Sequence, residues 1–312
     1  MSRAFLVSAT LCAAGLIGGA WSDRTSTPPP ERRDGYVILE ADMHAHTRFS
    51  DGLLSPFDLV LHARRQRLHA LAVTEHNMVF PGEIARWFSR IIHGPVVLVG
   101  EEITSSLYHV HAFGLTSRVI PTPDLGAVID RVHAQRAIVV AAHPVRHFWP
   151  SLMPVRARLD GAEVMHPIAY RSGGQWQWSD MVDFYERSAR DGHRLTAIGA
   201  SDYHGFSPLG LCRTLIFARE FTEESAMEAL REGRTVVIDH RGGLWGDLAL
   251  VESLRARPYR SAARESGYPD EGPIDRPAKV LAWVGLVGML LTRRPRTVTE
   301  APSPPRSEPL ES

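Results

Sequence analysis

Apolar runs that end in polar, chemically active residues recur along this chain, and they limit its fold more than any other feature. Runs of strand length precede His44, His76, Glu102, His143, His166 and Asp202. Segments with helical periodicity, such as residues 57–68 and 223–231, separate these runs. The repeated order of strand, polar loop and helix is typical of a parallel α/β sheet or barrel. In such barrels the active site forms at the C-terminal ends of the strands, so the polar endings also predict a site.

The first of these strand ends carries two histidines in alternate positions. Residues 36–41 form a predicted buried strand, and alternate residues of a strand share a face, so His44 and His46 should point the same way. The turn at residues 50–52 can bring Asp51 back towards them. Such a pair is a weak signal alone, because paired histidines more often make ordinary hydrogen bonds.

Later strand ends supply further groups of the same kind. Asp202 and His204 repeat the alternate spacing of His44 and His46. Imidazole and carboxylate ligands without thiolate suit Zn²⁺, Mn²⁺ or Fe²⁺ rather than a structural cysteine site. The candidate metal ligands are His44, His46, Asp51, His76, Glu102, His109, His143, Asp202 and His204. This number of ligands predicts two or three divalent ions, with a carboxylate such as Glu102 bridging them.

The segments that carry these residues have recognisable motifs. They are DMHAHTRFSDG at 42–52, AVTEHN at 72–77, GEEIT at 100–104, AAHP at 141–144 and ASDYH at 200–204. In this order they resemble the PHP (polymerase and histidinol phosphatase) family of metal-dependent phosphoesterases. The resemblance covers about residues 35–238 and implies a distorted (β/α)7 TIM-like barrel with a hydrolytic centre of two or three metal ions.

The resemblance also implies how the ligands are shared. It implies three groups around a bridging Glu102: His44 and His46 with Asp202 and His204, Asp51 with His76, and His109 with His143. His111 shares a strand face with His109, so the residues alone leave either one as the ligand. Glu75 stands where the family usually has Asp, and we expect it to orient a ligand.

Three residues are candidates for catalytic roles. His166 stands where an Asn is common in the family, and it could be an added ligand, a general acid or a plain substitution. His204 or His166 could protonate the leaving oxygen. Arg146 follows His143 and Pro144, and its guanidinium could neutralise a substrate phosphate or form a structural salt bridge.

The chemistry predicted from these residues is metal-dependent hydrolysis. We expect a phosphoesterase in which a metal-bridging hydroxide attacks a small organic phosphate ester. The alternatives are cleavage of a carboxylic ester, amide or carbamate at the same centre, or a metal-binding module without turnover. The 35 basic and 35 acidic side chains balance, so no nucleic-acid partner is expected.

The two ends of the chain predict attachment to a membrane. We expect a signal peptide or signal anchor at 1–21, a linker at 22–34, the PHP domain at 35–246, a second linker at 247–277, a membrane helix at 278–292 and a disordered tail at 293–312. A docking helix on the core is the alternative for 278–292. The arginines after residue 292, and Arg3 if the leader stays uncleaved, predict cytoplasmic ends, so we expect an exported or membrane-anchored protein with its catalytic domain outside the cytoplasm. With only Cys12 and Cys212 present, no internal disulfide framework is expected.

Overall fold

The computed structural model describes residues 2–22, 27–171, 174, 176–261 and 274–292. The chain divides into two compact units, one made of residues 1–24 and 271–312 and the other of residues 25–270. The tail predicted at 293–312 and residues 262–273 of the second predicted linker lie outside the described residues.

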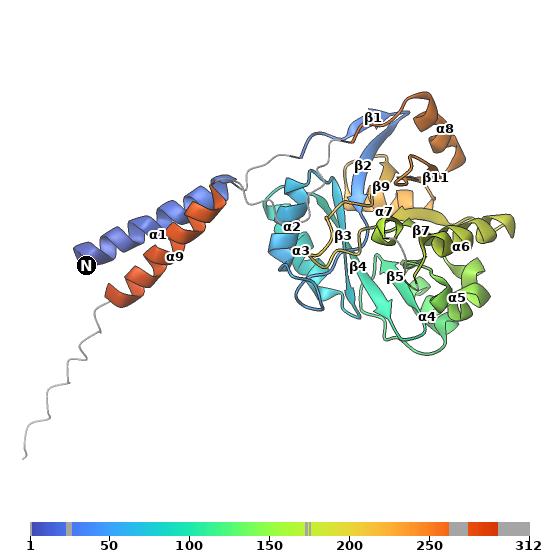
Figure 1. Cartoon of the computed structure of the whole chain (residues 1–312), viewed down its shortest axis with the longest axis horizontal. Helices are drawn as coiled ribbons and strands as arrows, with labels where there is room; N and C mark the ends of the chain where they lie inside the picture. Colours follow the sequence, from blue (N-terminus) through green and yellow to red (C-terminus); the bar gives the residue numbers. More distant parts are fainter. Residues whose placement is uncertain (1, 23–26, 172–173, 175, 262–273, 293–312) are drawn as a thin grey trace, which may run out of the picture. The chain divides into compact units, whose positions relative to one another are not determined.

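The larger unit is built on one sheet of eleven strands (Figure 1). The strands are β1 (Glu31–Arg33), β2 (Tyr36–Asp42), β3 (Ala70–His76), β4 (Val96–Thr104), β5 (His109–Phe113), β6 (Ile138–Ala141), β7 (Gly161–Met165), β8 (Thr196–Gly199), β9 (Thr214–Ala218), β10 (Thr235–Ile238) and β11 (Leu244–Gly246). Their order across the sheet is β11-β10-β9-β2-β3-β4-β5-β6-β7-β8, and β1 pairs with β2 off this path.

The strands do not all run in one direction. β2, β3 and β4 are parallel to one another, and so are β6, β7 and β8. β5 runs antiparallel to both β4 and β6, and β9 runs antiparallel to β2. The sheet is therefore mixed, where the sequence pattern predicted a parallel one.

The two edges of the sheet approach each other, which makes it a nearly closed barrel. Thr214 Oγ1 of β9 donates to the Gly199 carbonyl of β8 at 2.9 Å, and Thr235 Oγ1 of β10 donates to the Ala197 carbonyl at 2.8 Å. The predicted α/β barrel is confirmed in this mixed form.

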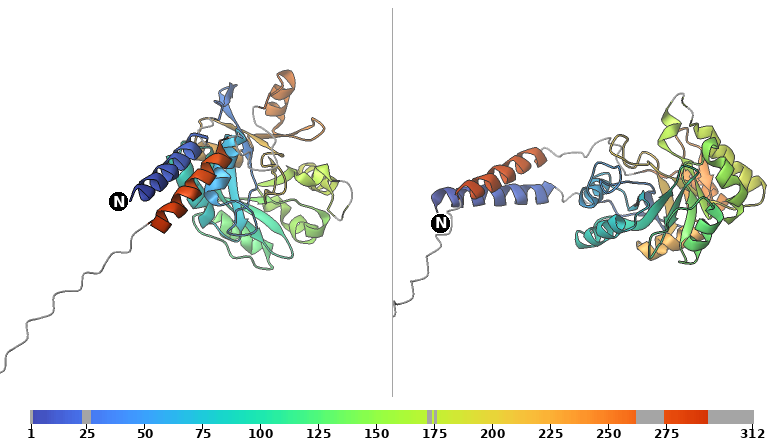
Figure 2. Two further views of the ribbon diagram at one scale, coloured as in Figure 1. Left: turned by 60° about the vertical axis from the view of Figure 1, so that its left-hand side comes forward. Right: turned by 90° about the horizontal axis from the view of Figure 1, so that it is seen from below.

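Helices cover the outside of the barrel, as the views in Figures 1 and 2 show. They are α2 (Pro56–Arg65), α3 (Phe80–Ile91), α4 (Leu125–His133), α5 (Trp149–Val155), α6 (Trp178–Arg190), α7 (Glu223–Arg231) and α8 (Leu248–Ala256), with short 3₁₀ turns η1 (Arg146–Phe148), η2 (Arg156–Arg158) and η3 (Pro167–Tyr170). Helix α2 begins as its sequence predicts, because Ser55 Oγ accepts the Asp58 N–H at 3.1 Å and Pro56 occupies the first turn.

The inside of the barrel is apolar at one end and polar at the other. Val37 and Ala70, near the starts of β2 and β3, pack with Ala226 and Leu230 of α7 in one buried cluster. Because alternate strand residues share a face, Leu98 and Glu102 of β4 both point inwards. Each inward face thus begins with core residues and ends with polar ones, which brings the polar strand ends together.

Two segments predicted to be linkers are partly structured. Glu31–Arg33 forms β1, which pairs antiparallel with β2. Leu248–Ala256 forms α8, and its Leu250, Val251 and Leu254 are buried against β2, β9 and β10. The folded unit therefore extends beyond Gly246, because this short helix buries one apolar stripe on the sheet.

The smaller unit consists of two helices, α1 (Arg3–Ser22) and α9 (Asp275–Thr292), which lie side by side in every view (Figures 1 and 2). Among the described residues, α1 alone is long and apolar enough by composition to cross a membrane, as a signal sequence or an anchor.

Candidate metal centre

The loop after β2 carries His44 and His46, and Asp42 fixes its path. The Asp42 carboxylate accepts N–H groups from His44 at 3.3 Å, Ser201 at 3.0 Å and Gly210 at 2.7 Å. A parallel bridge between Ala45 and Tyr203 joins the same two loops. This buried carboxylate therefore holds the loop after β2 against the loop after β8, although the motif analysis assigned it no role.

His44, His46 and Asp202 form one group of potential ligands. The two Nε2 atoms lie 2.8 Å apart, and Asp202 Oδ1 lies 3.1 Å from His44 Nε2 and 3.4 Å from His46 Nε2. Both histidines are fully buried. The backbone of Asp202 adopts a left-handed conformation with φ 45°, which costs on the order of 1–3 kcal/mol and is usually found where function requires it.

Glu102 lies between this group and two others. Its Oε2 is 3.4 Å from both His44 Nε2 and His46 Nε2 and 2.9 Å from His76 Nδ1. Its Oε1 faces the other way, 2.8 Å from His109 Nδ1 and 3.3 Å from His143 Nε2. One carboxylate thus serves separate sets of histidines, as a bridging ligand would.

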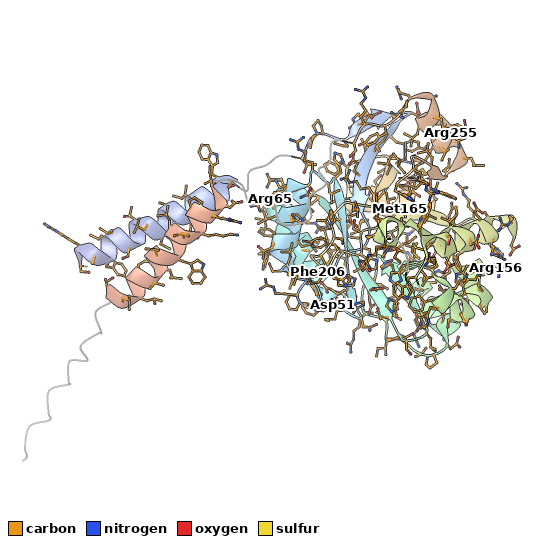
Figure 3. All side chains as sticks on the ribbon, viewed as in Figure 1. Asp51, Arg65, Arg156, Met165, Phe206 and Arg255 are labelled. Carbon is orange, nitrogen blue, oxygen red and sulfur yellow. The ribbon has the colours of Figure 1, made fainter. Side chains whose placement is uncertain are left out.

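A second group opens towards solvent. It comprises His46, Asp51, His76 and His204. Asp51 Oδ2 lies 3.2 Å from His76 Nε2, and Asp51 Oδ1 lies 3.2 Å from His204 Nε2. The Asp51 side chain is 52% exposed and marks the open side of the centre, and Figure 3 labels it at the surface.

The third group comprises Glu102, His109 and His143. Because β5 is antiparallel to its neighbours, His109 at its start lies at the same end of the sheet as Glu102 near the end of β4. Phe148 stacks on the His109 ring with centroids 4.8 Å apart, and Trp176 stacks on His143 at 5.2 Å. Between the two histidines left open by the sequence, the geometry brings His109 to Glu102.

His111 instead contacts Glu163, which the motif analysis did not select. Glu163 Oε1 lies 3.0 Å from His44 Nδ1 and 2.9 Å from His111 Nε2, and Glu163 Oε2 accepts the His143 N–H at 2.7 Å. A proton on His44 Nδ1 leaves Nε2 free for a metal ion. His44, His111 and Glu163 form a further potential ligand group. The available signal was one acidic residue inside the otherwise apolar run 161–165.

The electrostatics of the cluster favour ionised carboxylates. Burial opposes the charged form of Glu102, but the charge of His44 and hydrogen bonds from His109 hold its pKa well below the ordinary value. Burial opposes the charge of Asp202 too, and His44 again holds its pKa well below normal. Burial lowers the pKa of His46 to about 4. The carboxylates and His46 therefore have the protonation states that metal ions require. Burial opposes the charge of His44, but Asp202 and Glu102 raise its pKa well above the ordinary value.

The donor set fits divalent cations. Glu102 Oε2 and His143 Nδ1 are buried without a hydrogen-bond partner of ordinary geometry, and two imidazole nitrogens face each other at 2.8 Å. Buried polar atoms without partners are costly, and a shared cation would satisfy several of them. The separate groups around Glu102 indicate more than one metal site.

The remaining predicted residues have different surroundings. Glu75 accepts the Thr47 N–H at 2.7 Å and the Ser50 hydroxyl, so it supports the loop that carries Asp51. Arg146 Nε donates to Asp180 Oδ1 at 2.8 Å. His166 Nε2 lies 3.3 Å from Asp202 Oδ2.

Comparisons with known proteins add to this geometry. No model of a protein family matches the chain. The chain is 28% identical over 172 residues to the uncharacterized protein MJ1295 of Methanocaldococcus jannaschii, covering 51% of this chain and 72% of that protein. It is 23% identical over 149 residues to the uncharacterized protein MJ1587 of the same organism, covering 44% of this chain and 85% of that protein.

A solved structure from Bacteroides vulgatus is similar over most of the chain. It is a two-domain protein containing a predicted PHP-like metal-dependent phosphoesterase. It matches with a TM-score of 0.61 at 23% identity and covers 78% of this chain and 76% of that one. The chain therefore has a PHP-like fold, a nearly closed mixed α/β barrel that carries histidine-rich groups able to hold metal ions at one end.

Proposed function

We propose that this protein is a metal-dependent phosphoesterase that cleaves a small organic phosphate ester. The observation that supports it best is the position of Glu102, whose two oxygens face different sets of histidines. The exposed Asp51 leaves one side of the centre accessible to a small molecule. A substrate there would contact several potential ligand groups at once.

The ligands proposed for these ions are the nine residues predicted from the sequence. Divalent ions held by them would supply positive charge at a phosphoryl group and lower the pKa of a water molecule towards neutrality. Glu163 would keep the His44 ring in the orientation that presents Nε2. Asp42 would keep the loops after β2 and β8 together, so that His44, His46 and Asp202 stay aligned.

The hydrogen bonds of His166 support a role in proton transfer. Its Nδ1 accepts the Ile168 N–H at 3.2 Å, so the neutral ring carries its proton on Nε2. That nitrogen faces Asp202 at the edge of the first ligand group. The Nε2–H is a donor and not a ligand, so we assign His166 as the general acid for the leaving oxygen, in the form whose Nδ1 has also taken up a proton, because transfer from that cation leaves a neutral imidazole.

The hydrogen bonds of His204 support the opposite role. Its Nδ1 lies 2.9 Å from the Asp202 carbonyl, to which only a protonated nitrogen can donate. Its Nε2 then carries the lone pair and points towards Asp51. Of the two roles considered for His204, this geometry supports metal ligand rather than proton donor.

Carboxylic ester, amide or carbamate cleavage is the second candidate function, and Arg146 is the reason to keep it. Its guanidinium is paired with Asp180 at 2.8 Å and Asp183 at 3.2 Å, and it lies over the Trp149 ring. These contacts favour a structural role over binding of substrate phosphate. The cations proposed at the ligand groups would be as useful for a carbonyl substrate as for a phosphoryl one.

The proposed location of the barrel is outside the cytoplasm, with a membrane tether. The apolar helix α1 and the arginines at both ends of the sequence support it. A small phosphate ester in that compartment is the proposed substrate class, and we propose no nucleic-acid partner, in keeping with the balanced charge.

The test combines metal analysis with a substrate panel on the detergent-purified full chain. Metal content after loading with Mn²⁺ or Zn²⁺ should exceed one ion per chain. Hydrolysis of phosphate monoesters should exceed that of matched carboxylic esters, whereas the reverse preference would establish the second candidate. Absence of turnover on both classes with full metal content would refute a hydrolase.

His166→Asn separates the roles of that residue. As a general acid, it should lose about 10²–10⁴-fold on alkyl phosphates and little on aryl phosphates with good leaving groups, at unchanged metal content. Loss of metal from the variant would instead make His166 a ligand.

A further inference from the structure

The helices α1 and α9 contact each other through small residues. A side chain added at Gly15 of α1 would place its Cβ 2.3 Å from the Ala282 backbone nitrogen of α9. One added at Gly285 of α9 would lie 2.2 Å from the Cys12 nitrogen, and one at Gly288 would lie 2.3 Å from Ser8 Oγ. At these three glycines the two helices are therefore so close that any side chain larger than the hydrogen of glycine would push them apart.

The direction of the pair follows from these contacts. Ser8 lies opposite Gly288, whereas Gly15 lies opposite Ala278 and Ala282. The helices are antiparallel, so Arg3 and the end of α9 at Thr292 share one end of the pair. Arg293, Arg294 and Arg296 follow Thr292 in the sequence.

Large apolar side chains cover the outside of this pair instead of its interior. Leu16 and Ile17 of α1 are 63% and 67% exposed, and Trp283 and Leu290 of α9 are 66% and 62% exposed. Figure 3 shows side chains projecting outward from both helices. A helix pair in water buries its large apolar residues between the helices, so this pair has the arrangement suited to an apolar solvent.

The polar groups and the lengths of the helices are also compatible with an apolar solvent such as a lipid bilayer. No charged residue occurs at 4–22 or at 280–292. The hydroxyls of Thr10 and Thr292 donate to carbonyls of their own helices at 3.0 Å and 2.6 Å, so neither needs water. At about 1.5 Å per residue, the 20 residues of α1 extend about 30 Å, close to a bilayer core, and the uncharged residues 280–292 of α9 extend about 20 Å.

We propose that α1 and α9 span a lipid bilayer together as an antiparallel two-helix anchor, with α1 retained in the mature protein. Alone, α9 has only twelve consecutive apolar residues, Val280–Leu291, after Asp275, Arg276 and Lys279. Close packing on α1 gives it a partner within the bilayer, and its charged first turn lies at the membrane surface. The arginine-rich end faces the cytoplasm by the positive-inside tendency. This inference does not depend on the chemistry of the metal centre.

A cysteine cross-link in native membranes tests the pair. The test variant carries Gly18→Cys and Ala278→Cys, whose Cβ atoms would lie 3.4 Å apart, with Cys12→Ser to remove the natural thiol of the helix pair. Oxidation should join the two positions within one chain, and the intact chain should keep residues 1–21 and resist alkaline carbonate extraction. The control variant carries Leu16→Cys and Leu290→Cys, whose side chains face outward, and it should give no intramolecular product.

Two glycines of α1 supply a matched pair of further variants. Gly15→Val in the cross-linking background should abolish the disulfide, because its Cβ meets the α9 backbone. Gly19→Val should leave it intact, because a Cβ there meets nothing within 4 Å. Removal of residues 1–20 from the mature chain, release by carbonate, or disulfides only between two chains would each overturn the proposal. The last result would assign the apolar surface to a second copy.

Discussion

The metal centre and the helix pair depart from an ordinary protein surface and core in opposite ways. The barrel buries a cluster of histidines and carboxylates, whereas the helix pair exposes leucine, isoleucine and tryptophan. A buried polar group and an exposed apolar surface are the two informative exceptions to the usual distribution. We propose divalent cations as the partners of the first and lipid as the surroundings of the second. The comparison teaches that the surroundings of a residue can be inferred from what its contacts leave unsatisfied.

Among the variants that test this comparison, removal of two proposed metal ligands should have the largest effect. The double variant His44→Ala/His46→Ala should lose metal and reduce turnover by more than about 100-fold, because residues that merely orient ligands already account for about 10–100-fold. Elemental analysis and a hydrolysis assay measure both effects, and His193→Ala outside the cluster is the control. Unchanged metal content and turnover would contradict the ligand assignment.

A charge introduced on the outside of the helix pair tests the second part of the comparison, the contact of these apolar side chains with lipid. Leu16→Arg should weaken membrane retention by about 2.5–3.5 kcal/mol, the usual cost of a cation near the middle of a spanning helix. Fractionation with carbonate washing measures the retained share, and Leu16→Phe is the control. Equal retention of both variants would show that Leu16 does not face lipid.

Neutralising Glu163 should have an intermediate effect within the barrel. In Glu163→Gln, the amide NH₂ replaces one of the two carboxylate oxygens, which contact His44, His111 and the His143 backbone N–H. A donor then faces a donor, so at least one of these hydrogen bonds is lost. We expect metal affinity to fall about 10–100-fold with the fold retained. Metal titration monitored by calorimetry gives the affinity, and the exposed Glu186→Gln is the control. An unchanged affinity would exclude a positioning role.

The last effect is on stability alone, and it concerns Glu101, the neighbour of Glu102 on the other face of β4. Burial raises the pKa of Glu101 from 4.5 to about 7. The folded state then binds the extra proton between these values, so its contribution to stability falls as pH rises through this window. Glu101→Gln should therefore be more stable than the parent at pH 8 by up to about 3 kcal/mol, from 1.36 kcal/mol per pKa unit, and nearly equal at pH 4. Urea unfolding at both pH values checks this, and a pH-independent difference would contradict it.

The sequence predicted strand ends better than it predicted strand directions. The bounds of α7 match the expected segment 223–231, and β7 is the expected run of strand length before His166. The reversed direction of β5 was not predictable, since side chains alternate identically in parallel and antiparallel strands. Helix α8 was missed because its short apolar stripe lies in a polar stretch. Predicting the barrel thus required periodicity alone, whereas its mixed pairing depends on contacts between distant segments.

The sequence predicted the site residues that lie in motifs. It missed residues such as Glu163, whose role is to position another side chain. His44, His76 and Asp202 end apolar runs, so they were selected. Glu163 lies inside such a run, and only the contacts with His44 and His111 give it a role. The glycines of the helix pair are similar, because composition shows small residues without showing what they contact.

The contact between Asp42 and Ser201 also bears on how the barrel folds. These residues are 159 positions apart, and their hydrogen bond joins the first long strand to the loop after β8. Loop-closure entropy must be lost before such a distant contact forms, which makes it a late event in folding. His44 and Asp202 meet only after that step, so a chain still emerging from synthesis cannot assemble the first ligand group. Metal uptake at this group would then mark a finished barrel and, by mass action, hold it closed.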